Sequence, residues 1–461
     1  MKNRALMFAA PASGSGKTLI TCGMLKLLKN RGLKPASFKC GPDYIDPMFH
    51  KTVIGVDASN IDLFFCDNKT AAYLFKENSK GFDISVAEGV MGYYDGMSVN
   101  STAASSYEVA RTLGLPVIMV INSRGQSISS LAVLKGMAEF KKDSNIKGVI
   151  FNNMSKHVYD ALKNEVKEVT GIEPLGYLPK CSELSIESRH LGLVTPEEID
   201  DLSGKLDRLA KLMEETIDIE KILEISYGYD FPSAEEISVC KVQGSPKIAV
   251  ARDEAFCFYY RDNLSLLKRM GAEIVEFSPI HDEKLPDGTD GVILGGGYPE
   301  LYCDALFSNK TMTEDIKRKL DNGMPCMAEC GGFMYLHEEM EDMKGNVYKA
   351  VGHIQGKAFK TDSLRRFGYI NLKSKINSNL VKQGETIKAH EFHYFDSDNC
   401  GSGFKAVKPV TGRSWECVNT GENSIMGFPH LFYYSNTKIA ERFLEAAVKY
   451  REGDKKVWQK L

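Results

Sequence analysis

The chain lacks the features that would place it in a membrane or outside the cell. Its 461 residues contain no apolar run long enough to span a bilayer, and its N-terminus lacks the zones of a signal peptide. The eleven cysteines include no CxxC pair, and the only close pair, Cys326 and Cys330, has a spacing that suits no common zinc site. There is no internal repeat and no low-complexity tract. We therefore expect a cytoplasmic protein whose thiols are reduced and, with one exception, inert.

An excess of charge of one sign is also missing. The 58 Lys and Arg residues are interspersed with 61 Asp and Glu residues, and the formal net charge is -3. This balance predicts no nucleic-acid partner and no membrane surface. With 43% hydrophobic and 26% charged residues, the chain is globular, and its length predicts two α/β domains or at most three.

A glycine-rich turn near the N-terminus is the most informative stretch. It separates a predicted strand, Ala5–Ala10, from a predicted helix, Leu19–Leu28. Such a turn surrounds a phosphate with backbone N–H groups and a helix N-terminus. Pro11 stands where the strict motif has glycine, but a flexible turn with an incidental lysine would not explain the order of strand, turn, Lys-Thr and helix. The predicted nucleotide-binding residues are Gly14, Ser15, Gly16, Lys17 and Thr18.

Short apolar strands alternate with amphipathic helices through the first half, which predicts a doubly wound parallel sheet over residues 1–195. Residues 196–246 are expected to be a helical segment and linker, and residues 247–461 a second α/β domain. The predicted strands are Ala5–Ala10, Pro35–Lys39, Ile84–Ala87, Val117–Ile121, Gly148–Asn152, Lys247–Ala251, Glu273–Phe277, Gly291–Leu294 and Met324–Ala328. The predicted helices of the first domain are Leu19–Lys29, Thr70–Phe75, Ser127–Phe140 and Val158–Val169.

Acidic residues follow two first-domain strands, at the sheet edge where ligands collect. A magnesium ion between ATP phosphates requires one hydroxyl and one or two carboxylates, which Thr18, Asp43 and Glu88 can supply. Asp46 and Asp95 then remain for handling the substrate. The alternative for each of these acids is a turn residue that bonds its own backbone.

A cysteine lies at a tight turn between a predicted strand and a predicted helix. Cys330 is followed by Gly331 and Gly332, which is the arrangement of a nucleophile elbow. The helix N-terminus favours the thiolate, and backbone N–H groups can stabilise an oxyanion. Gly296 and Gly297, which also follow a strand, are expected to supply further N–H groups to the substrate.

Two histidine-containing segments can supply a base for this cysteine. His430 lies far along the sequence, as the base of a triad usually does. His390 and His393 form a second candidate cluster, for which structural histidines in polar networks are an equal alternative.

Together these residues resemble one family closely, the a,c-diamide synthases of corrinoid and related tetrapyrrole biosynthesis. The resemblance covers essentially the whole chain and accounts for the proline at position 11, which that family also carries. It implies a dethiobiotin-synthetase-like P-loop domain followed by a class I glutamine-amidotransferase-like α/β domain. The residues that carry it are Ala10–Thr18, Lys39–His50, Glu88–Gly92, Ala255–Tyr260, Gly295–Glu300 and Glu329–Gly332.

The resemblance implies a mechanism with two half-reactions. Cys330, assisted by His430, releases ammonia from glutamine through a thioester. ATP, bound with Mg²⁺, phosphorylates the a- and c-acetate carboxylates of cobyrinate, and ammonia displaces the phosphate. The resemblance assigns Thr18, Asp43 and Glu88 to the metal and Asp46 and Asp95 to the reacting carboxylate. It also implies that Tyr44, within the same loop, contacts the substrate.

One departure from the class and several alternatives accompany this interpretation. Class I amidotransferases commonly carry a glutamate two residues after the base, where this chain has Phe432, so a Cys–His dyad is expected. Nickel sirohydrochlorin or hydrogenobyrinate can replace cobyrinate as the tetrapyrrole polyacid. A non-catalytic nucleotide-switched scaffold is a further alternative, although Ala12 stands where such proteins often carry a lysine. The sequence leaves the oligomeric state open, with a homodimer as one option.

Overall fold

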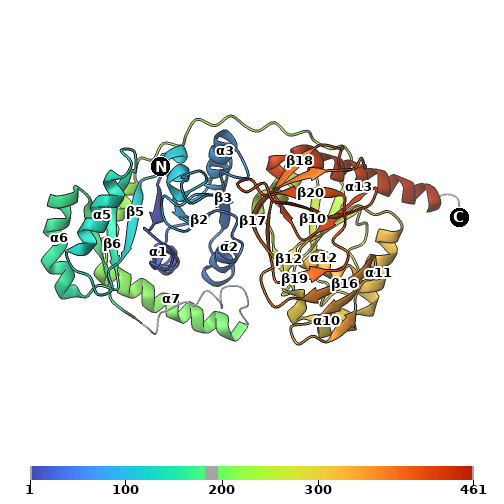
Figure 1. Ribbon diagram of the computed structural model, residues 1–461, viewed down its shortest axis with the longest axis horizontal. Coiled ribbons are helices and arrows are strands. Elements are labelled where there is room, and N and C mark those ends of the chain that lie inside the picture. The colour runs from blue at the N-terminus through green and yellow to red at the C-terminus, as the bar shows by residue number, and fades with distance from the viewer. Residues whose placement is uncertain (1–2, 182–195, 459–461) are drawn as a thin grey trace. The chain divides into compact units, whose positions relative to one another are not determined.

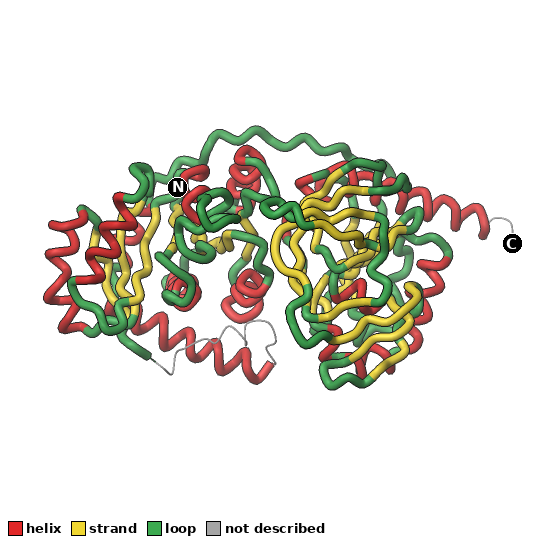
Figure 2. The backbone as a smooth tube through the Cα atoms, in the orientation of Figure 1, coloured by secondary structure: helices red, strands yellow, loops and turns green. Residues whose placement is uncertain are grey.

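The chain divides into two units, Met1–Ile237 and Ser238–Leu461. The structure is a computed structural model that describes residues 3–181 and 196–458. Each unit contains a parallel sheet covered by helices, as the alternating pattern of the sequence predicts (Figures 1 and 2). Within the described residues, no helix combines the length and the apolar character that crossing a membrane requires.

The first unit is built on a seven-stranded sheet with the order β3-β2-β4-β1-β5-β6-β7, in which every pairing is parallel. All five residues of β1 are fully buried, because the sheet is covered on both faces. The strands are β1 (Ala5–Ala9), β2 (Pro35–Cys40), β3 (Ala58–Ile61), β4 (Ile84–Glu88), β5 (Val117–Asn122), β6 (Ile146–Asn152) and β7 (Glu173–Leu178). The helices are α1 (Lys17–Asn30), α2 (Ile45–Phe49), α3 (Asn68–Asn78), α4 (Ser106–Leu113), α5 (Ser129–Glu139), α6 (Lys156–Thr170), α7 (Pro196–Thr216) and α8 (Ile219–Ser226).

Helix α7 belongs to the first unit rather than to a separate linker. Its residues Leu209 and Met213 are buried in the same core as α1, and a Cβ at Gly23 of α1 would lie 2.4 Å from the Met213 sulfur. Such a close approach of the two helices depends on the missing side chain. The helical segment and linker expected over residues 196–246 therefore contains two helices that pack within the first unit, followed by residues 229–246 without helix or strand.

The second unit contains a six-stranded sheet with the order β10-β8-β11-β13-β23-β22, parallel except for β22. One face packs on α10, α11 and α12, and the other packs on α9, α13 and an antiparallel sheet with the order β21-β20-β17-β18-β24. The helices are α9 (Arg261–Arg269), α10 (Cys303–Ser308), α11 (Lys310–Asp321), α12 (Gly331–Tyr335) and α13 (Thr437–Trp458).

After about Val347 the sequence predicted shorter strands, but β17 and β18, with nine and eight residues, are the longest strands of the described residues. The strands of the second unit thus differ widely in length. They are β8 (Lys247–Ala251), β9 (Phe256–Phe258), β10 (Glu273–Phe277), β11 (Gly291–Leu294), β12 (Gly296–Gly297), β13 (Cys326–Glu329), β14 (His337–Glu341), β15 (Val347–Lys349), β16 (Ile354–Lys360), β17 (Arg366–Ser374), β18 (Thr386–His393), β19 (Phe395–Ser397), β20 (Phe404–Val407), β21 (Ser414–Cys417), β22 (Asn419–Thr420), β23 (Ser424–Gly427) and β24 (His430–Leu431).

Candidate active sites

The predicted phosphate loop lies between β1 and α1. Gly14 and Gly16 have φ angles of 74° and 96°, which only glycine adopts freely. A Cβ at Gly16 would lie 2.1 Å from the side-chain nitrogen of Asn152, which donates a hydrogen bond to the Ser15 carbonyl at 3.0 Å. Asn152, at the end of β6, thus holds the phosphate loop in place through a contact between residues distant in sequence. The loop therefore presents its backbone at the N-terminus of α1 in the form that phosphate binding requires.

Lys17 projects from the first turn of α1 across the loop. Its Nζ donates hydrogen bonds to the carbonyls of Ala12 at 3.3 Å and Met91 at 2.6 Å. Burial lowers the pKa of Lys17 to about 8, although the negative charge of Glu88 partly offsets this effect. Among the described residues, the ammonium thus donates to two backbone carbonyls of neighbouring loops, and a phosphate would be a stronger acceptor.

A buried cluster of charges lies beneath the loop, at the ends of β2 and β4. Thr18 donates a hydrogen bond from Oγ1 to Glu88 Oε1 at 2.6 Å, and Lys39 Nζ lies 2.8 Å from the same oxygen. Lys39 also forms an ion pair with Asp46. The three charged side chains are at most 8% exposed, and the site is therefore a set of charges that compensate one another in a medium of low polarity.

The pKa values of this cluster follow from burial and from the neighbouring charges. Burial would lower the pKa of Lys39, but Glu88 and Asp46 outweigh it and hold the ammonium charged. Burial raises the pKa of Glu88 despite Lys39. For Asp46, burial is again the largest single effect, but the charges of Lys39 and His50 and the side-chain hydrogen bonds together outweigh it and lower the pKa. The pKa of Asp43 is raised by burial and by the neighbouring Asp46.

Of the three residues predicted to bind the metal, Thr18 and Glu88 are in direct contact, whereas Asp43 contacts other residues of its own loop. Glu88 contacts Thr18 directly, whereas Asp43 accepts the Ile45 N–H at 2.9 Å and lies beside Asp46. Tyr44 immediately precedes α2 in the same loop, and its backbone carbonyl accepts a helical hydrogen bond. Asp95 is exposed, accepts the Gly92 N–H at 3.0 Å, and acts on the charge of Lys17. Among the described residues, no three His, Cys, Asp or Glu side chains form a metal cluster of their own.

Cys330 occupies the sharp turn between β13 and α12. Its φ of 49° and ψ of -105° are unusual for a residue with a side chain, and strain of this kind is common at functional sites. Two backbone hydrogen bonds fix the turn, from Cys330 N–H to the Gly427 carbonyl at 2.8 Å and from Met334 N–H to the Cys330 carbonyl at 2.9 Å. Cys330 is 8% exposed at the N-terminus of the short helix, as a nucleophile elbow requires.

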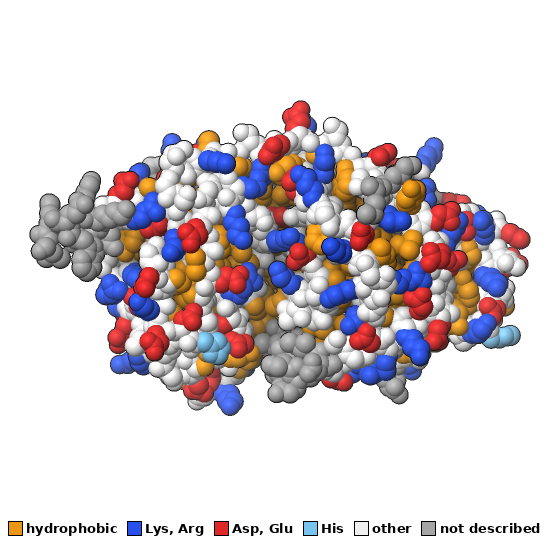
Figure 3. Space-filling view, turned by 180° about the vertical axis from the view of Figure 1, so that it is seen from behind, with side chains coloured by type: hydrophobic (Ala, Val, Ile, Leu, Met, Phe, Trp, Pro, Cys, Tyr) orange, Lys and Arg blue, Asp and Glu red, His pale blue; other side chains and the backbone are white. Residues whose placement is uncertain are grey.

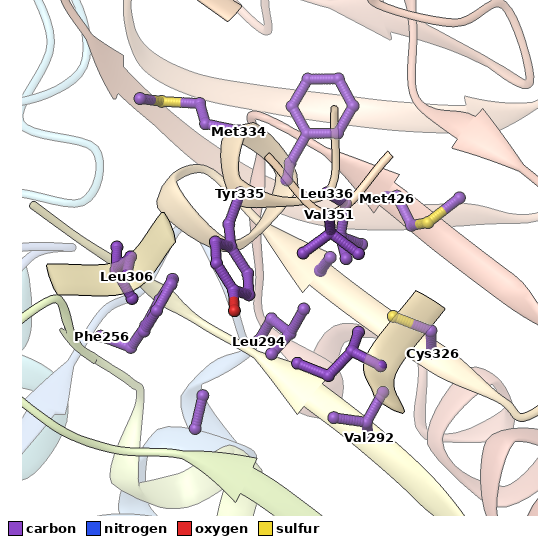
Figure 4. Close-up of a cluster of buried hydrophobic side chains, with 14 of the residues drawn as sticks. Phe256, Val292, Leu294, Leu306, Cys326, Met334, Tyr335, Leu336, Val351 and Met426 are labelled. Carbon is purple, nitrogen blue, oxygen red and sulfur yellow. The ribbon is translucent and has the colours of Figure 1, made fainter. Parts of the chain in front are cut away.

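The buried apolar cluster beneath this elbow holds α12 in place. In Figure 4, Tyr335 of this helix points toward Phe256 and Leu294, and its ring packs edge-on against Phe256 with centroids 5.3 Å apart. Tyr335, Phe256 and Leu294 are completely buried. The elbow is therefore supported by a rigid core.

His430 lies beside the predicted nucleophile. Burial alone would lower its pKa, but hydrogen bonding and charge from Cys330, followed by those of Glu329, raise the pKa to about 9. The Nδ1 atom of His430 lies 3.7 Å from Glu329 Oε2, and the imidazole is 3% exposed. The structure thus brings Cys330 and His430 together across a hundred residues of sequence, and adds a carboxylate that the sequence did not indicate.

The glycines of the preceding loop line the same site. A Cβ at Gly296 would lie 2.4 Å from Cε1 of His430, and a Cβ at Gly331 would lie 3.2 Å from the Gly297 nitrogen. The Gly332 N–H donates to the Gly295 carbonyl at 2.9 Å. This loop therefore approaches both the base and the elbow at distances that exclude side chains.

The second histidine cluster divides between the two faces of β18. His390 pairs with His430 in the register of β18 and β24, and its ring packs edge-on against Phe367 and Tyr369. His393 stacks on Phe428 with centroids 4.0 Å apart and bonds the Phe395 carbonyl. These contacts describe histidines held in structural networks, and they leave His430 as the base candidate.

Two family models match the chain, one in each unit. Residues 6–194 match the CobQ/CobB/MinD/ParA nucleotide binding domain, and residues 247–418 match the CobB/CobQ-like glutamine amidotransferase domain. The match in the second unit includes Cys330 and ends before His430. Together these domains define the class of the protein, a glutamine-dependent, amide-forming ligase with a P-loop nucleotide-binding domain.

Relatives with curated names match nearly the whole chain. Proteins named cobyrinate a,c-diamide synthase from Caldanaerobacter subterraneus subsp. tengcongensis and Picrophilus torridus are 37% and 38% identical to it, over 96% and 97% of this chain and 98% and 99% of their own. The protein of that name from Clostridium acetobutylicum is 38% identical over 94% of this chain and 98% of its own. The chain belongs to the cobyrinate a,c-diamide synthase family. The solved structure of PurLQS from Thermotoga maritima covers 45% of this chain and 99% of its own, with 19% identity and a TM-score of 0.32.

Proposed function

We propose that the chain amidates the a- and c-acetate carboxylates of cobyrinate, with ATP to activate each carboxylate and glutamine as the source of ammonia. The observation that carries the proposal is the contact between Cys330, in its strained turn, and His430, in a chain that also contains an intact phosphate loop. A non-catalytic scaffold would have no need for a strained nucleophile beside a base.

In the glutamine half-reaction, the Cys330 thiol gives its proton to His430, and the thiolate attacks the side-chain amide carbon of glutamine. His430 returns the proton to the departing nitrogen, so that ammonia leaves and a thioester remains. Water then hydrolyses the thioester, with His430 accepting its proton. The raised pKa of His430 supports this assignment, because a base beside a thiolate must hold the proton between the two steps.

The oxyanion that forms during this attack needs N–H donors close to Cys330. We assign this role to the loop of Gly296 and Gly297 and to the N-terminus of α12, since a side chain at Gly296 would displace the base. The close approach of Gly297 to Gly331 supports the same assignment.

In the ATP half-reaction, Lys17 and the backbone of the phosphate loop bind and orient the terminal phosphates. We propose that Thr18 and Glu88 hold Mg²⁺, with Asp43 completing the set. Oε2 of Glu88 lies 4.0 Å from the buried Nε2 of His50, whereas Oε1 accepts from Thr18 and is the oxygen that would face the ion. Magnesium, when bound, would neutralise charge on the transferring phosphate.

We propose that the substrate carboxylate meets the nucleotide at the same sheet edge. A carboxylate is a poor acyl donor, and phosphorylation supplies a leaving group that ammonia can displace. Asp46, held ionised by Lys39, and Asp95, beside Lys17, would act at the site of phosphorylation and amidation, where an ionised carboxylate can accept hydrogen bonds from ammonia. Tyr44 would contact the macrocycle from the same loop.

The proposal also includes a cytoplasmic location and no nucleic-acid partner. On the face of the molecule drawn in Figure 3, basic and acidic side chains are interspersed, which offers no uniformly basic surface to a nucleic acid.

The product of the purified enzyme tests the proposal. Incubation with ATP, Mg²⁺ and glutamine should convert two acids of cobyrinate to amides, detected by mass spectrometry, in a panel that includes hydrogenobyrinate and nickel sirohydrochlorin. Amidation of nickel sirohydrochlorin but not of cobyrinate would assign a different substrate. Absence of nucleotide consumption with every polyacid of the panel would refute the proposed reaction.

A further inference from the structure

The position from which a class I amidotransferase commonly orients its base carries no carboxylate here. Phe432, two residues after His430, is 3% exposed, and its ring packs edge-on against Tyr260 with centroids 5.5 Å apart. A phenyl ring carries no charge and no oxygen, so it cannot stabilise an imidazolium as a carboxylate does. Any orienting carboxylate must come from another element.

Glu329, the last residue of β13, supplies a carboxylate on the required side of the base. Its Oε2 lies 3.7 Å from Nδ1 of His430, and its Oε1 accepts the Leu431 N–H at 3.3 Å. The carboxylate thus contacts both the imidazole and the backbone of the strand that carries it. Glu329 is 8% exposed, so little solvent screens this interaction.

The strained elbow explains how two consecutive residues reach one imidazole. Successive side chains of a strand point to opposite faces of the sheet. The chain leaves strand geometry at Cys330, where φ is 49° and ψ is -105°. The turn brings the thiol back to the base that Glu329 already contacts, as the influence of both residues on the pKa of His430 indicates.

We propose that Glu329 is the positioning residue of the glutaminase site and takes the role that a glutamate at position 432 would have. Its carboxylate faces Nδ1 of His430 as an ion pair at 3.7 Å, longer than a hydrogen bond, and leaves Nε2 to exchange the proton with Cys330. When the thiol proton moves to Nε2, Glu329 stabilises the imidazolium, and when the proton moves on to the departing ammonia, the neutral imidazole keeps its orientation. This inference rests on the proposed function of Cys330 and His430.

Other ionisable groups near His430 are less suited to this role. His390 faces it across β18 and β24, and burial lowers the pKa of His390 to about 3, so it is neutral. The charge of His430 also lowers the pKa values of Glu391 and His393 on β18 slightly, against or beside the larger effect of burial. Burial raises the pKa of Glu391 to about 7, so at neutral pH Glu391 is only partly ionised. Glu329 is therefore the carboxylate in closest ionic contact with the base.

The test compares Glu329→Gln with the control Glu339→Gln and with Glu329→Asp and Glu391→Gln, all in the full-length enzyme. Glutamine keeps the size of the side chain and an acceptor for the Leu431 N–H, so the fold is expected to survive. Glutamine-driven kcat should fall by about 10²-fold or more with little change in KM, whereas the rate with added ammonium salt should stay at the wild-type value. Glu339→Gln, an exposed change on β14, should leave both rates unchanged.

A pH profile distinguishes positioning of the base from a structural role. Without Glu329 the imidazolium is less stable and so is the thiolate beside it. Alkylation of Cys330 by iodoacetamide, located by mass spectrometry, should therefore require a pH higher by about one unit. Glu329→Asp should partly restore the profile.

Two results would overturn the inference: a wild-type pH profile and glutamine-driven kcat in Glu329→Gln, or a shifted profile in Glu391→Gln but not in Glu329→Gln. Failure of the wild-type enzyme to hydrolyse glutamine would refute the proposed function itself. That outcome differs from the two above, in which the wild type is active and only the role assigned to Glu329 fails.

Discussion

Replacing Lys39 with methionine would leave two buried carboxylates without their cation. Lys39 Nζ lies 2.8 Å from Glu88 Oε1 and also pairs with Asp46, and all three side chains are at most 8% exposed. Removal of one partner from a buried pair typically costs about 3–5 kcal/mol, because the remaining charge is uncompensated. We expect a loss of this size in the stability of the first unit at pH 8.

The loss should depend on pH in a defined direction. Wild-type Asp46 has a lowered pKa, so it contributes stability above its unfolded pKa, and this contribution disappears as the pH falls through the folded value. In Lys39→Met, the folded pKa values of Asp46 and Glu88 rise above the unfolded values. The variant is then most stable at low pH, where both carboxyl groups are neutral, and it loses stability as the pH rises through their folded pKa values. The difference between variant and wild type should therefore be small near pH 4 and largest above neutrality.

Hydrogen exchange followed by mass spectrometry suits this measurement, because a chain of two units need not unfold in one step. Peptides from β2 and β4 should lose protection in the variant, and peptides from the second unit provide an internal control. Lys156→Met, which removes an exposed ion pair within α6, should cause no measurable change. A loss below about 1 kcal/mol at pH 8, or a loss equally large at pH 4, would contradict the account of buried charge compensation.

Further predictions concern two glycines and one buried acid. Gly16→Ala should weaken ATP binding measured by calorimetry at least about tenfold more than Gly14→Ala, since both have positive φ but only the Cβ at position 16 meets a side chain. Gly296→Ala should lower glutamine-driven kcat about 10²-fold by displacing His430, with the ammonia-driven rate retained; equal loss of both rates would contradict this. Glu391→Gln should stabilise the second unit at pH 8 but not at pH 4. The pKa of Glu391 is raised from 4.5 to about 7, so the wild type loses about 3 kcal/mol as the pH rises through this range; equal thermal stability at pH 8 would refute the assignment.

The sequence predicted the central strands better than the edge strands. β1 and β5 are continuous apolar runs that lie in the middle of the sheet, and both were expected within one residue of their observed ends. β3 and β7 were not predicted, because edge strands tolerate polar residues, proline and glycine, as Pro174 and Gly176 in β7 illustrate.

The local motifs were similarly accessible, whereas their partners were not. The phosphate loop and the cysteine elbow depend on residues adjacent in sequence, and the structure contains both turns. The support of the loop by Asn152 and the pairing of Lys39 with Glu88 join residues far apart, which no local pattern indicates. Glu329 escaped notice for a different reason, since strand alternation predicts that it points away from Cys330 until the strained turn is known.

The most direct test of the account is the pair of rates of Cys330→Ala with cobyrinate, ATP and Mg²⁺. We predict that glutamine no longer supports product, whereas ammonium salt gives the diamide at the wild-type rate, because the two half-reactions use different units of the chain. Retention of glutamine-driven product in this variant would show that Cys330 is not the nucleophile. Loss of both activities in a folded variant would contradict the separation of nitrogen supply from carboxylate activation.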